Sequence, residues 1–548
     1  MDKAYYILRT KFGHVDFLPS QKKAIEYSID KFDLLIIAKT SAGKSLCYQL
    51  PALCCNGLTI IISPLKSLID DQINNLKKNN IDSHFLYGNI DRLQKKKLYD
   101  SLLKDNFESL ILYTTPETLE FNTEFNNILS KLHKKNLINR FVIDEAHTIS
   151  TWGHEFRNSY LKLSSIRINY PNIPITALTA TATPEVKEDI IDILGLKNYK
   201  LITQSIIRNN LYIDIKKNYS NLQQKIIEII KDKYLNKTGI IYCNSKKKCE
   251  EVNFVLKKNN LNSNYYHAGM DSYERNKIQS LWKNGDIHII VATIAFGMGI
   301  DKSDVRFVIH YNIPKNIESY YQEIGRAGRD NKKSDCILFF NDNDITQYNS
   351  QIKKNISEIN NHNELLYLNN QLNKIDQIKS FINNDIDCRQ YLLSYYFGTS
   401  ENIKCLNCDN CFKKDENYYK EDVTHICLNI IKAIKFLDKD ADKYKIKKIL
   451  YSREKNNKIF DSNLYGSCIS ICNILYDRTF IHLVSNNYIS ESVKKINNIW
   501  FSFITLNNKS KLINKKNNPI YLLSSKNKTT IDDFFKKSFS VDTKCYNG

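Results

Sequence analysis

A loop of small residues between an apolar strand and an apolar helix restricts the fold of this chain more than any other feature. Residues 34–37 (LLII) are predicted to form a buried strand, residues 38–45 (AKTSAGKS) a tight loop, and residues 46–53 a helix. Such a loop is typical of phosphate binding, because its backbone N–H groups and the helix N-terminus point at phosphate oxygens. The sequence therefore predicts a nucleotide site in an α/β fold.

Within the loop we expect Thr40, Gly43, Lys44 and Ser45 to bind ATP. The Lys44 ammonium can reach the outer phosphates, and the Ser45 hydroxyl can ligate Mg²⁺. The alternative is a strand-to-helix turn that carries a lysine by coincidence. Upstream, the side-chain amide of Gln21 can pair with both the donor and the acceptor on the edge of adenine. A polar residue at a helix start is the alternative for Gln21.

Apolar strands alternate with helical stretches beyond the loop, which is the pattern of a parallel α/β sheet. Residues 58–63 and 110–115 are two of these strands, and they end in the polar segments 64–67 and 116–117. Open α/β sheets bind ligands at the carboxyl ends of their strands. We therefore expect the two polar segments to contact a nucleic-acid strand.

An acidic pair, Asp144 and Glu145, directly follows the apolar strand 140–143. Opposite a phosphate-binding loop, such a pair can divide the work of ATP hydrolysis. Asp144 is expected to hold Mg²⁺, and Glu145 to polarise the attacking water.

The charge of the chain favours a polyanionic partner. The formal net charge is +20 and the pI is about 9.1, and Lys and Arg gain affinity by releasing counterions from phosphates. Compositional drift is the alternative, because the whole chain is rich in Lys, Asn and Ile. No apolar run has the roughly 18 to 20 residues of a membrane span, and the N-terminus resembles neither a signal nor a transit peptide. We therefore expect a cytoplasmic or nuclear protein without a membrane partner.

Four of the fourteen cysteines form a cluster in the sequence: Cys388, Cys405, Cys408 and Cys411. Two overlapping Cys-x-x-Cys units and a distant fourth thiol suit a closed tetrahedral Zn²⁺ site. Four thiolates leave no open position, so the metal is expected to be structural. The other ten cysteines are scattered and are interpreted as packing residues.

Several motifs carry a resemblance to a known family. The DEAH sequence at 144–147, together with LTATA at 178–182, resembles motifs II and III of superfamily 2 helicases. The segment between them, 148–157, is similar to the aromatic-rich loop of RecQ helicases. It carries the expected DNA contacts Trp152, His154, Phe156 and Arg157. Trp152 and Phe156 offer stacking faces worth roughly 1–3 kcal/mol per base, and core packing is their alternative.

The segment 320–329 (YYQEIGRAGR) is nearly identical to helicase motif VI. Arg326 and Arg329 are expected on one face of a helix, reaching across a cleft toward the γ-phosphate. We assign the arginine finger to Arg329, with Arg326 and Gln322 beside it; ordinary surface arginines are the alternative. Because the loop and the acids lie in one lobe and the arginines in another, hydrolysis should require closure of the cleft.

The sequence departs from the RecQ pattern at a few positions. Leu18 stands where the family usually has Arg, and His14 where it has an aromatic residue. Ser41 stands where the helicase form of the loop has Gly, so it can weaken nucleotide binding if the backbone needs a positive φ there.

The C-terminal half continues the resemblance. The segment 388–411 resembles the RecQ zinc domain, and three helix-like stretches and a hairpin after residue 417 fit a winged helix, which in RecQ proteins binds duplex DNA. Trp500 is expected in the core. In the tail, residues 528–535 resemble the sliding-clamp-binding box, with Ile531, Phe534 and Phe535 as the apolar anchors. Folding back onto the same protein is the alternative for this segment.

The resemblance implies two RecA-like parallel-sheet lobes, a zinc-binding helical module and a winged-helix domain. It implies an ATP-dependent 3′→5′ DNA helicase that uses Mg²⁺ and structural Zn²⁺, acts on single-stranded, duplex and junction DNA in the nucleus, and serves recombination, repair and replication. A DEAH-type RNA helicase and a non-catalytic nucleic-acid-binding scaffold are the alternatives. The expected domains are the first lobe, second lobe, zinc module, winged helix and tail, at 1–203, 204–345, 346–416, 417–525 and 526–548.

Overall fold

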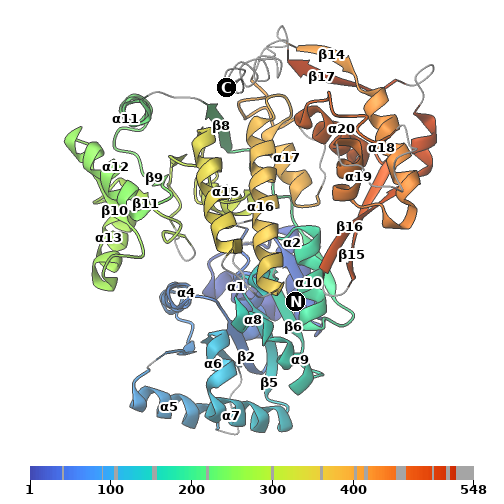
Figure 1. Cartoon of the computed structure of the whole chain (residues 1–548). Coiled ribbons are helices and arrows are strands. Elements are labelled where there is room, and N and C mark those ends of the chain that lie inside the picture. The colour runs from blue at the N-terminus through green and yellow to red at the C-terminus, as the bar shows by residue number, and fades with distance from the viewer. Residues whose placement is uncertain are drawn as a thin grey trace. The chain divides into compact units, whose positions relative to one another are not determined.

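The computed structural model of the chain (Figure 1) divides into two compact units. One unit comprises Met1–Ile378 with Tyr396–Thr399, and the other comprises Lys379–Tyr395 with Ser400–Gly548. The structure describes residues 1–39, 42–88, 90–103, 109–150, 157–217, 221–297, 302–357, 362–399, 404–412, 418–451, 464–496, 499–513 and 519–525.

The first sheet has seven parallel strands in the order β3-β4-β2-β5-β6-β1-β7. Its strands are short runs of apolar and β-branched residues, which favour a sheet that is buried on both faces. Their bounds are β1 Leu34–Ile37, β2 Gly57–Ile62, β3 His84–Leu86, β4 Ser109–Thr114, β5 Ile138–Ile143, β6 Ile175–Thr179 and β7 Lys200–Thr203.

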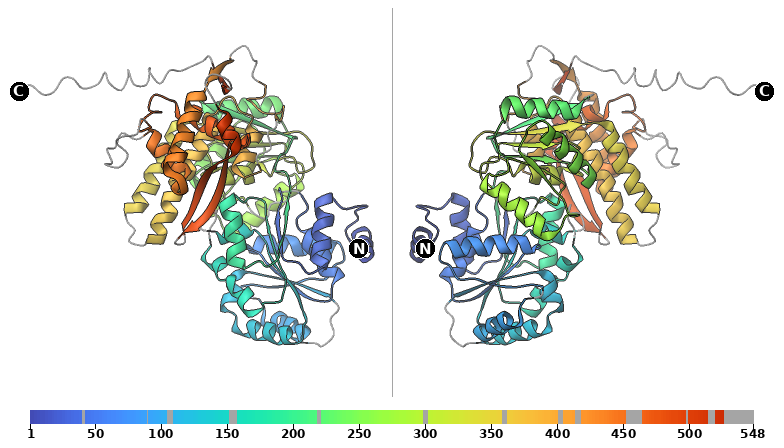
Figure 2. Two further views of the ribbon diagram at one scale, coloured as in Figure 1. Left: turned by 90° about the vertical axis from the view of Figure 1, so that its right-hand side faces the viewer. Right: turned by 90° about the vertical axis from the view of Figure 1, so that its left-hand side faces the viewer.

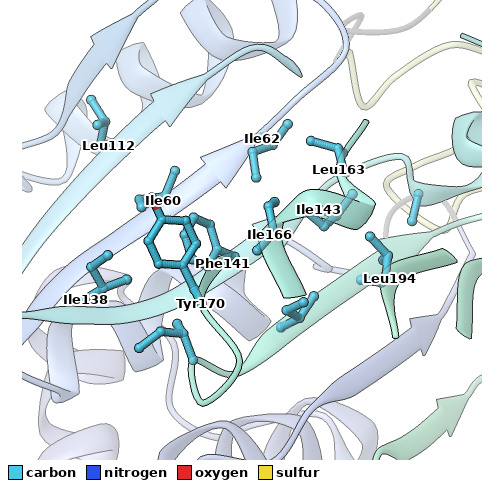
Figure 3. Close-up of a cluster of buried hydrophobic side chains, with 14 of the residues drawn as sticks. Ile60, Ile62, Leu112, Ile138, Phe141, Ile143, Leu163, Ile166, Tyr170 and Leu194 are labelled. Atoms are coloured by element: carbon cyan, nitrogen blue, oxygen red, sulfur yellow. The ribbon is translucent and has the colours of Figure 1, made fainter. Parts of the chain in front are cut away.

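Alternate residues of these strands pack into two separate cores. Figure 3 shows one of them, where Ile60 of β2 and Phe141 of β5 lie beside Tyr170. The neighbouring residues Ile61 and Val142 belong to the core on the opposite face. Helices cover both faces, as the edge-on views of this sheet show (Figure 2).

Helices α2 to α4 pack on one face of the first sheet, and α5, α7, α9 and α10 on the other. The bounds in this part of the chain are α1 Asp2–Lys11, α2 Pro19–Ile29, α3 Leu46–Cys54, α4 Lys66–Lys78, α5 Arg92–Leu102, α6 Pro116–Phe121, α7 Thr123–Lys134, η1 Ala146–Ile149, α8 Asn158–Leu161, α9 Ser164–Asn169 and α10 Pro184–Leu194.

The second sheet has six parallel strands in the order β10-β11-β9-β12-β13-β8. The two parallel sheets confirm the prediction of two α/β lobes. The strands are β8 Leu211–Lys217, β9 Gly239–Tyr242, β10 Ser263–Tyr266, β11 Ile289–Ala292, β12 Phe307–His310 and β13 Ser334–Phe340. The helices that follow β8 are α11 Leu222–Lys233, α12 Lys246–Lys258, α13 Ser272–Asn284, α14 Ile317–Ile324, α15 Asp342–Ser357 and α16 His362–Asn383.

The second unit has its own apolar core, built by three helices and a long antiparallel hairpin, β15–β16. Buried Ile489 and Ile504 anchor the base of the hairpin in this core. Three helices followed by a hairpin are the elements that the sequence predicts here, and the winged-helix assignment stays a prediction. The side chains of Trp500 and Phe501 lie outside the described residues. The bounds are α17 Arg389–Tyr396, β14 Tyr418–Asp422, α18 Thr424–Leu437, η3 Asp438–Asp440, α19 Lys443–Tyr451, α20 Asn473–Ser485, β15 Ile489–Ile496, β16 Ile499–Leu506, η4 Asn508–Leu512 and β17 Tyr521–Ser525.

Among the residues that the structure describes, no helix combines the length and the apolar character needed to cross a membrane.

Candidate nucleotide-binding site

The phosphate-binding loop connects the end of β1 to the start of α3, as the sequence predicts. Gly43 has φ 67°, and a Cβ atom at this position would lie 2.4 Å from Nε2 of Gln21. Only glycine fits this backbone without strain. Lys44 Nζ donates a hydrogen bond of 3.0 Å to the carbonyl oxygen of Ala38. The expected ligand Thr40 and the atypical Ser41 lie outside the described residues.

Gln21 is buried beneath the loop. Its Nε2 atom donates to the carbonyl oxygens of Ala42 and Gly43 at 3.2 and 3.4 Å, and its Oε1 atom accepts a hydrogen bond of 3.0 Å from Leu18 N. The amide therefore ties the first turn of α2 to the phosphate-binding loop. This structural contact was not part of the expectation from sequence, and the predicted contact to adenine stays a prediction.

The charges around Lys44 come from both lobes. Burial lowers the pKa of Lys44, Glu145 and Asp144 oppose this effect, and the positive charge of Arg329 adds to it. Arg329 follows α14 of the second lobe, so charges from both lobes influence the pKa of Lys44.

The acidic pair follows β5 directly. Burial and the neighbouring Glu145 raise the pKa of Asp144. Burial has the same tendency at Glu145, but a hydrogen bond from His147 and the positive charges of His147, Lys44 and Arg326 outweigh it and lower the pKa of Glu145. The two carboxyl groups are thus pushed in opposite directions, an arrangement that separates the roles of paired acids. Glu145 also has φ 48°, in the left-handed region, which costs of order 1–3 kcal/mol for a residue with a side chain.

His147 links the acidic pair to the next motif. Its ring is fully buried, and Nδ1 lies 3.0 Å from Oγ1 of Thr179 and 3.3 Å from a carboxylate oxygen of Glu145. Thr179 Oγ1 in turn donates to the carbonyl oxygen of Thr181. The sequence identified both motifs but gave no role to His147, because the contact joins residues that are far apart in the chain.

Gln322 extends this network into the second lobe. It lies on α14, and its Nε2 atom is 3.3 Å from Oγ1 of Thr181. Gln322 of the second lobe therefore contacts the segment that follows β6 in the first lobe.

The two arginines of the same motif do not lie on a helix, contrary to the prediction. Helix α14 ends at Ile324, and Arg326 and Arg329 follow in consecutive turns. The physical reason is the backbone at Gly328, whose φ of 53° lies outside the helical region and whose N–H donates to the carbonyl oxygen of Val305 at 2.9 Å. Buried Arg208 stabilises the resulting turn by donating to the carbonyl oxygens of Gly325 and Gly328 at 3.0 and 2.6 Å.

A large cavity of about 1080 Å³ lies at the carboxyl ends of β2 and β4. Of the polar segments predicted to contact nucleic acid, 64–67 and 116–117, the residues Pro64, Leu65, Lys66 and Glu117 line it. Arg157 borders the same region, since its Nη1 atom donates a hydrogen bond of 2.6 Å to the carbonyl oxygen of Pro64. The other residues of the predicted DNA loop, Trp152, His154 and Phe156, lie outside the described residues.

The cysteine cluster fits a zinc ion. The Sγ atoms of Cys388, Cys405, Cys408 and Cys411 all lie within 4.8 Å of one another, and those of Cys405 and Cys411 are 3.9 Å apart. A tetrahedral site with Zn–S bonds of about 2.3 Å has sulfur–sulfur distances of roughly 3.8 Å. The backbone N–H of Cys405 donates to Cys388 Sγ at 3.3 Å, which suits a thiolate ligand.

Arg389, directly after the first cysteine, is fully buried and stabilises the cluster although it is not one of the predicted zinc ligands. Its guanidinium makes two hydrogen bonds of 2.9 Å to the carboxylate of Asp409 and one of 2.6 Å to the carbonyl oxygen of Phe381. Asp409 stands between Cys408 and Cys411, so the ion pair bridges the two ends of the predicted zinc site.

Three family models match consecutive parts of the chain. The DEAD/DEAH box helicase model matches residues 18–190, the helicase conserved C-terminal domain residues 221–331, and the RecQ zinc-binding model residues 342–412.

Curated relatives extend these matches. The chain is 35% identical to ATP-dependent helicase SGS1 of Saccharomyces cerevisiae over 503 residues, covering 89% of this chain and 34% of that protein. It is 35% identical to ATP-dependent DNA helicase Q1 of Rattus norvegicus over 439 residues, covering 79% of this chain and 68% of that protein. The chain thus spans only about a third of SGS1 but more than two thirds of the rat protein.

Among solved structures, the helicase MrfA bound to DNA has a TM-score of 0.53 at 19% identity, and the match covers 70% of this chain and 57% of MrfA. This likeness supports the helicase fold. The RecQ zinc-binding model matches this chain, and the chain is 35% identical to the rat relative over 68% of that protein. The chain therefore belongs to the RecQ family of helicases.

Proposed function

We propose that this chain is an ATP-driven DNA helicase that moves 3′→5′ along a single strand. The observation that carries the proposal is the arrangement of opposite charges from two lobes around one loop. Lys44 and the acidic pair belong to the first lobe, and the charge of Arg329, from the second, acts on Lys44. RecQ relatives named as DNA helicases support DNA as the substrate.

In the proposed reaction, Lys44 holds the outer phosphates, and Ser45 and Asp144 would hold the metal, which when bound neutralises charge on the phosphate oxygens. Glu145, held ionised by its lowered pKa, accepts a proton from the attacking water. The water oxygen bonds to the γ-phosphorus while the bond to the bridging oxygen breaks and ADP leaves. Arg329 stabilises the charge that develops on the transferred group.

Adenine selection is assigned to Gln21, with Thr40 and Gly43 completing the phosphate contacts. A Gln21→Ala variant should therefore lose affinity for ATP more than for GTP. Equal losses for the two nucleotides would leave Gln21 with only its contact to the phosphate-binding loop.

Single-stranded DNA is proposed to follow the carboxyl ends of the strands, over the cavity near Pro64 and Thr115, with Trp152, His154, Phe156 and Arg157 alongside. The cavity is lined by cationic and aromatic side chains: Lys66, Lys95, Tyr87 and Phe121. This lining supports the path, because positive charges attract the phosphate backbone of DNA and aromatic rings stack on its bases. The hairpin β15–β16 is proposed to form the wing of a winged helix that meets duplex or junction DNA.

We propose that the chain is divided into domains at 1–203, 204–345, 346–416, 417–525 and 526–548. We also propose that the protein is located in the nucleus, because the proposed helicase acts on chromosomal DNA. We also propose that Ile531, Phe534 and Phe535 bind a sliding clamp. Capture by an immobilised clamp should be lost in a Phe534→Ala/Phe535→Ala variant, and undiminished capture would contradict this partner.

The central test is DNA-stimulated ATP hydrolysis. The full chain should release phosphate faster when single-stranded DNA is added, and Lys44→Ala should abolish the release while the melting temperature is retained. Lys23→Ala, which removes an exposed lysine of α2, is the matched control and should retain activity. No hydrolysis by the parent chain, or normal hydrolysis by Lys44→Ala, would overturn the proposal.

Substrate choice is tested separately. Matched DNA and RNA duplexes with either a 3′ or a 5′ single-stranded extension should be compared, and only DNA with a 3′ extension should be unwound efficiently. Preferential unwinding of RNA would favour the alternative of an RNA helicase.

A further inference from the structure

Helix α14, which precedes the two arginines, contains a buried charged residue that has no part in the proposed hydrolysis of ATP. Glu318, in its first turn, is only 2% exposed and accepts a hydrogen bond of 2.6 Å from Nζ of Lys374 on α16. An ion pair this deeply buried is costly to desolvate, and breaking it leaves an uncompensated charge. Glu318 therefore fixes α14 at one defined place.

The last residue of α17 and the turn that follows it, together called the Tyr396–Gly398 turn, pack against the same helix. The ring of Phe397 lies 5.1 Å from the ring of Tyr321 on α14, at an angle of 56°. Phe397 and Tyr321 are 7% and 3% exposed, so the contact is a closed apolar junction. Tyr396 approaches the ion pair as well, since burial, with Glu318 second, raises the pKa of its phenol.

The other side of this turn touches the first lobe. Gly398 has φ 71°, and a Cβ atom there would lie 2.9 Å from Cγ of Pro184, the first residue of α10. Pro184 stands three residues after Thr181, whose hydroxyl lies 3.3 Å from Nε2 of Gln322 on α14. Each of three elements thus contacts the other two: α14, the segment Thr181–Pro184, and the turn.

We propose that the Tyr396–Gly398 turn is a positioning element for ATP hydrolysis, which holds α14 so that the arginines beyond it meet the nucleotide. The turn touches no phosphate; it acts through Tyr321 and Glu318. Because misplacing a catalytic group by about 1 Å can cost on the order of 100-fold in rate, loosening this junction should slow the chemical step without weakening ATP binding. The inference rests on the ATP hydrolysis proposed above.

No sequence motif indicates this role. In the chain, the turn lies between the predicted zinc ligands Cys388 and Cys405, and no motif in this stretch indicates a contact with the second lobe. Only the structure shows that Phe397 packs on a helix of the second lobe.

The decisive variant is Phe397→Ala, assayed in the full chain for steady-state ATP hydrolysis with saturating single-stranded DNA. We expect kcat to fall by about tenfold or more while KM for ATP changes by less than about threefold. Phe397→Leu, which keeps most of the apolar volume but removes the ring contact with Tyr321, should give a kcat between those of Phe397→Ala and the parent chain. Phe254→Ala, which removes a 68% exposed ring from α12 of the same lobe, is the matched control and should behave like the parent chain.

Bound zinc and melting temperature separate positioning from folding. Phe397→Ala should retain one equivalent of zinc per chain, with a single unfolding transition. If this variant unfolds, Phe397→Leu decides: a lowered kcat at unchanged KM supports the inference, and a kcat equal to that of the parent overturns it. The inference also fails if Phe397→Ala is as fast as the parent chain, or if its KM rises while kcat is unchanged. Failure of the parent chain to hydrolyse ATP would instead overturn the proposed function.

Discussion

The Nδ1 atom of His147 lies 3.0 Å from the Oγ1 atom of Thr179, which joins the strand-end acids after β5 to the end of β6. From Thr179 the hydrogen bonds continue through Thr181 to Gln322. The proposed general base and the arginine-bearing segment are thus connected by contiguous polar contacts inside the first lobe and across to the second.

His147→Ala should slow ATP hydrolysis. The substitution removes the hydrogen bond from His147 that lowers the pKa of Glu145, so the ionised form of the carboxylate is less stabilised. A hydrogen bond to a charged group is worth about 1.5–3 kcal/mol, and we expect kcat to fall by roughly tenfold or more. Thr179→Val tests the remaining link, since it keeps the shape but removes the hydroxyl. A Thr179→Val variant with unchanged kcat would show that the relay through Thr179 is dispensable.

Metal binding should depend on pH through Asp144. Its pKa is raised by burial and by Glu145, so the proton is retained to higher pH than for an ordinary carboxyl group. A metal ligand must be deprotonated, and the apparent Mg²⁺ affinity should therefore rise with pH through the neutral range. It can be measured from the binding of a fluorescent ATP analogue at increasing Mg²⁺ concentrations.

Glu145→Gln provides the matched comparison for this pH dependence. It removes the neighbouring negative charge that helps to raise the pKa of Asp144, so the midpoint should move to lower pH. Protonation of the nucleotide is the same for both proteins and cancels in the difference. Identical midpoints would contradict the assignment of the titration to Asp144.

Arg329→Ala should lower kcat for ATP hydrolysis by about 10³-fold or more, because arginine fingers contribute on the order of 10³ to 10⁵ in rate. Arg329→Lys should recover little, since a lysine ammonium cannot reproduce the planar fork of a guanidinium. Lys333→Ala, at an exposed position nearby, is the control. Single-turnover phosphate release measures the chemical step directly, and a normal rate for Arg329→Ala would remove the finger assignment.

Asp409→Leu should destabilise the second unit strongly. It leaves the fully buried guanidinium of Arg389 without its counter-charge, at a cost of about 3–5 kcal/mol. Asp385, whose carboxylate is 49% exposed and 3.9 Å from Arg389, gives the control. Asp385→Asn should cost less than about 1 kcal/mol. Urea unfolding followed with zinc content would compare the two, and equal losses would contradict a special role for the buried pair.

Sequence reasoning located the elements that depend on local patterns. The apolar runs at 34–37, 58–63 and 110–115 are strands to within a residue or so, because a doubly covered parallel sheet requires continuous apolar residues. The cysteine cluster was equally accessible, since metal-ligand spacing is encoded along the chain.

Features that arise from tertiary contacts were missed. Arg326 and Arg329 looked helical by their spacing. Gly328 between them has φ 53°, and Arg208 stabilises the resulting turn from a distant part of the chain. Lys374 lies in a polar, Asn-rich stretch that gave no functional signal, yet its ammonium is buried against Glu318. Local spacing contains no information about partners that lie more than a hundred residues away in the chain, or on another element.

Arg208 lies in the connection between β7, the last strand of the first sheet, and β8, the first strand of the second. Its two hydrogen bonds fasten that connection to the turn bearing Arg326 and Arg329. Arg208 therefore couples the connection between the two sheets to the arginine turn. We expect any change in the path of this connection to displace the guanidinium groups as well, so that the relative position of the two sheets controls the approach of the proposed finger.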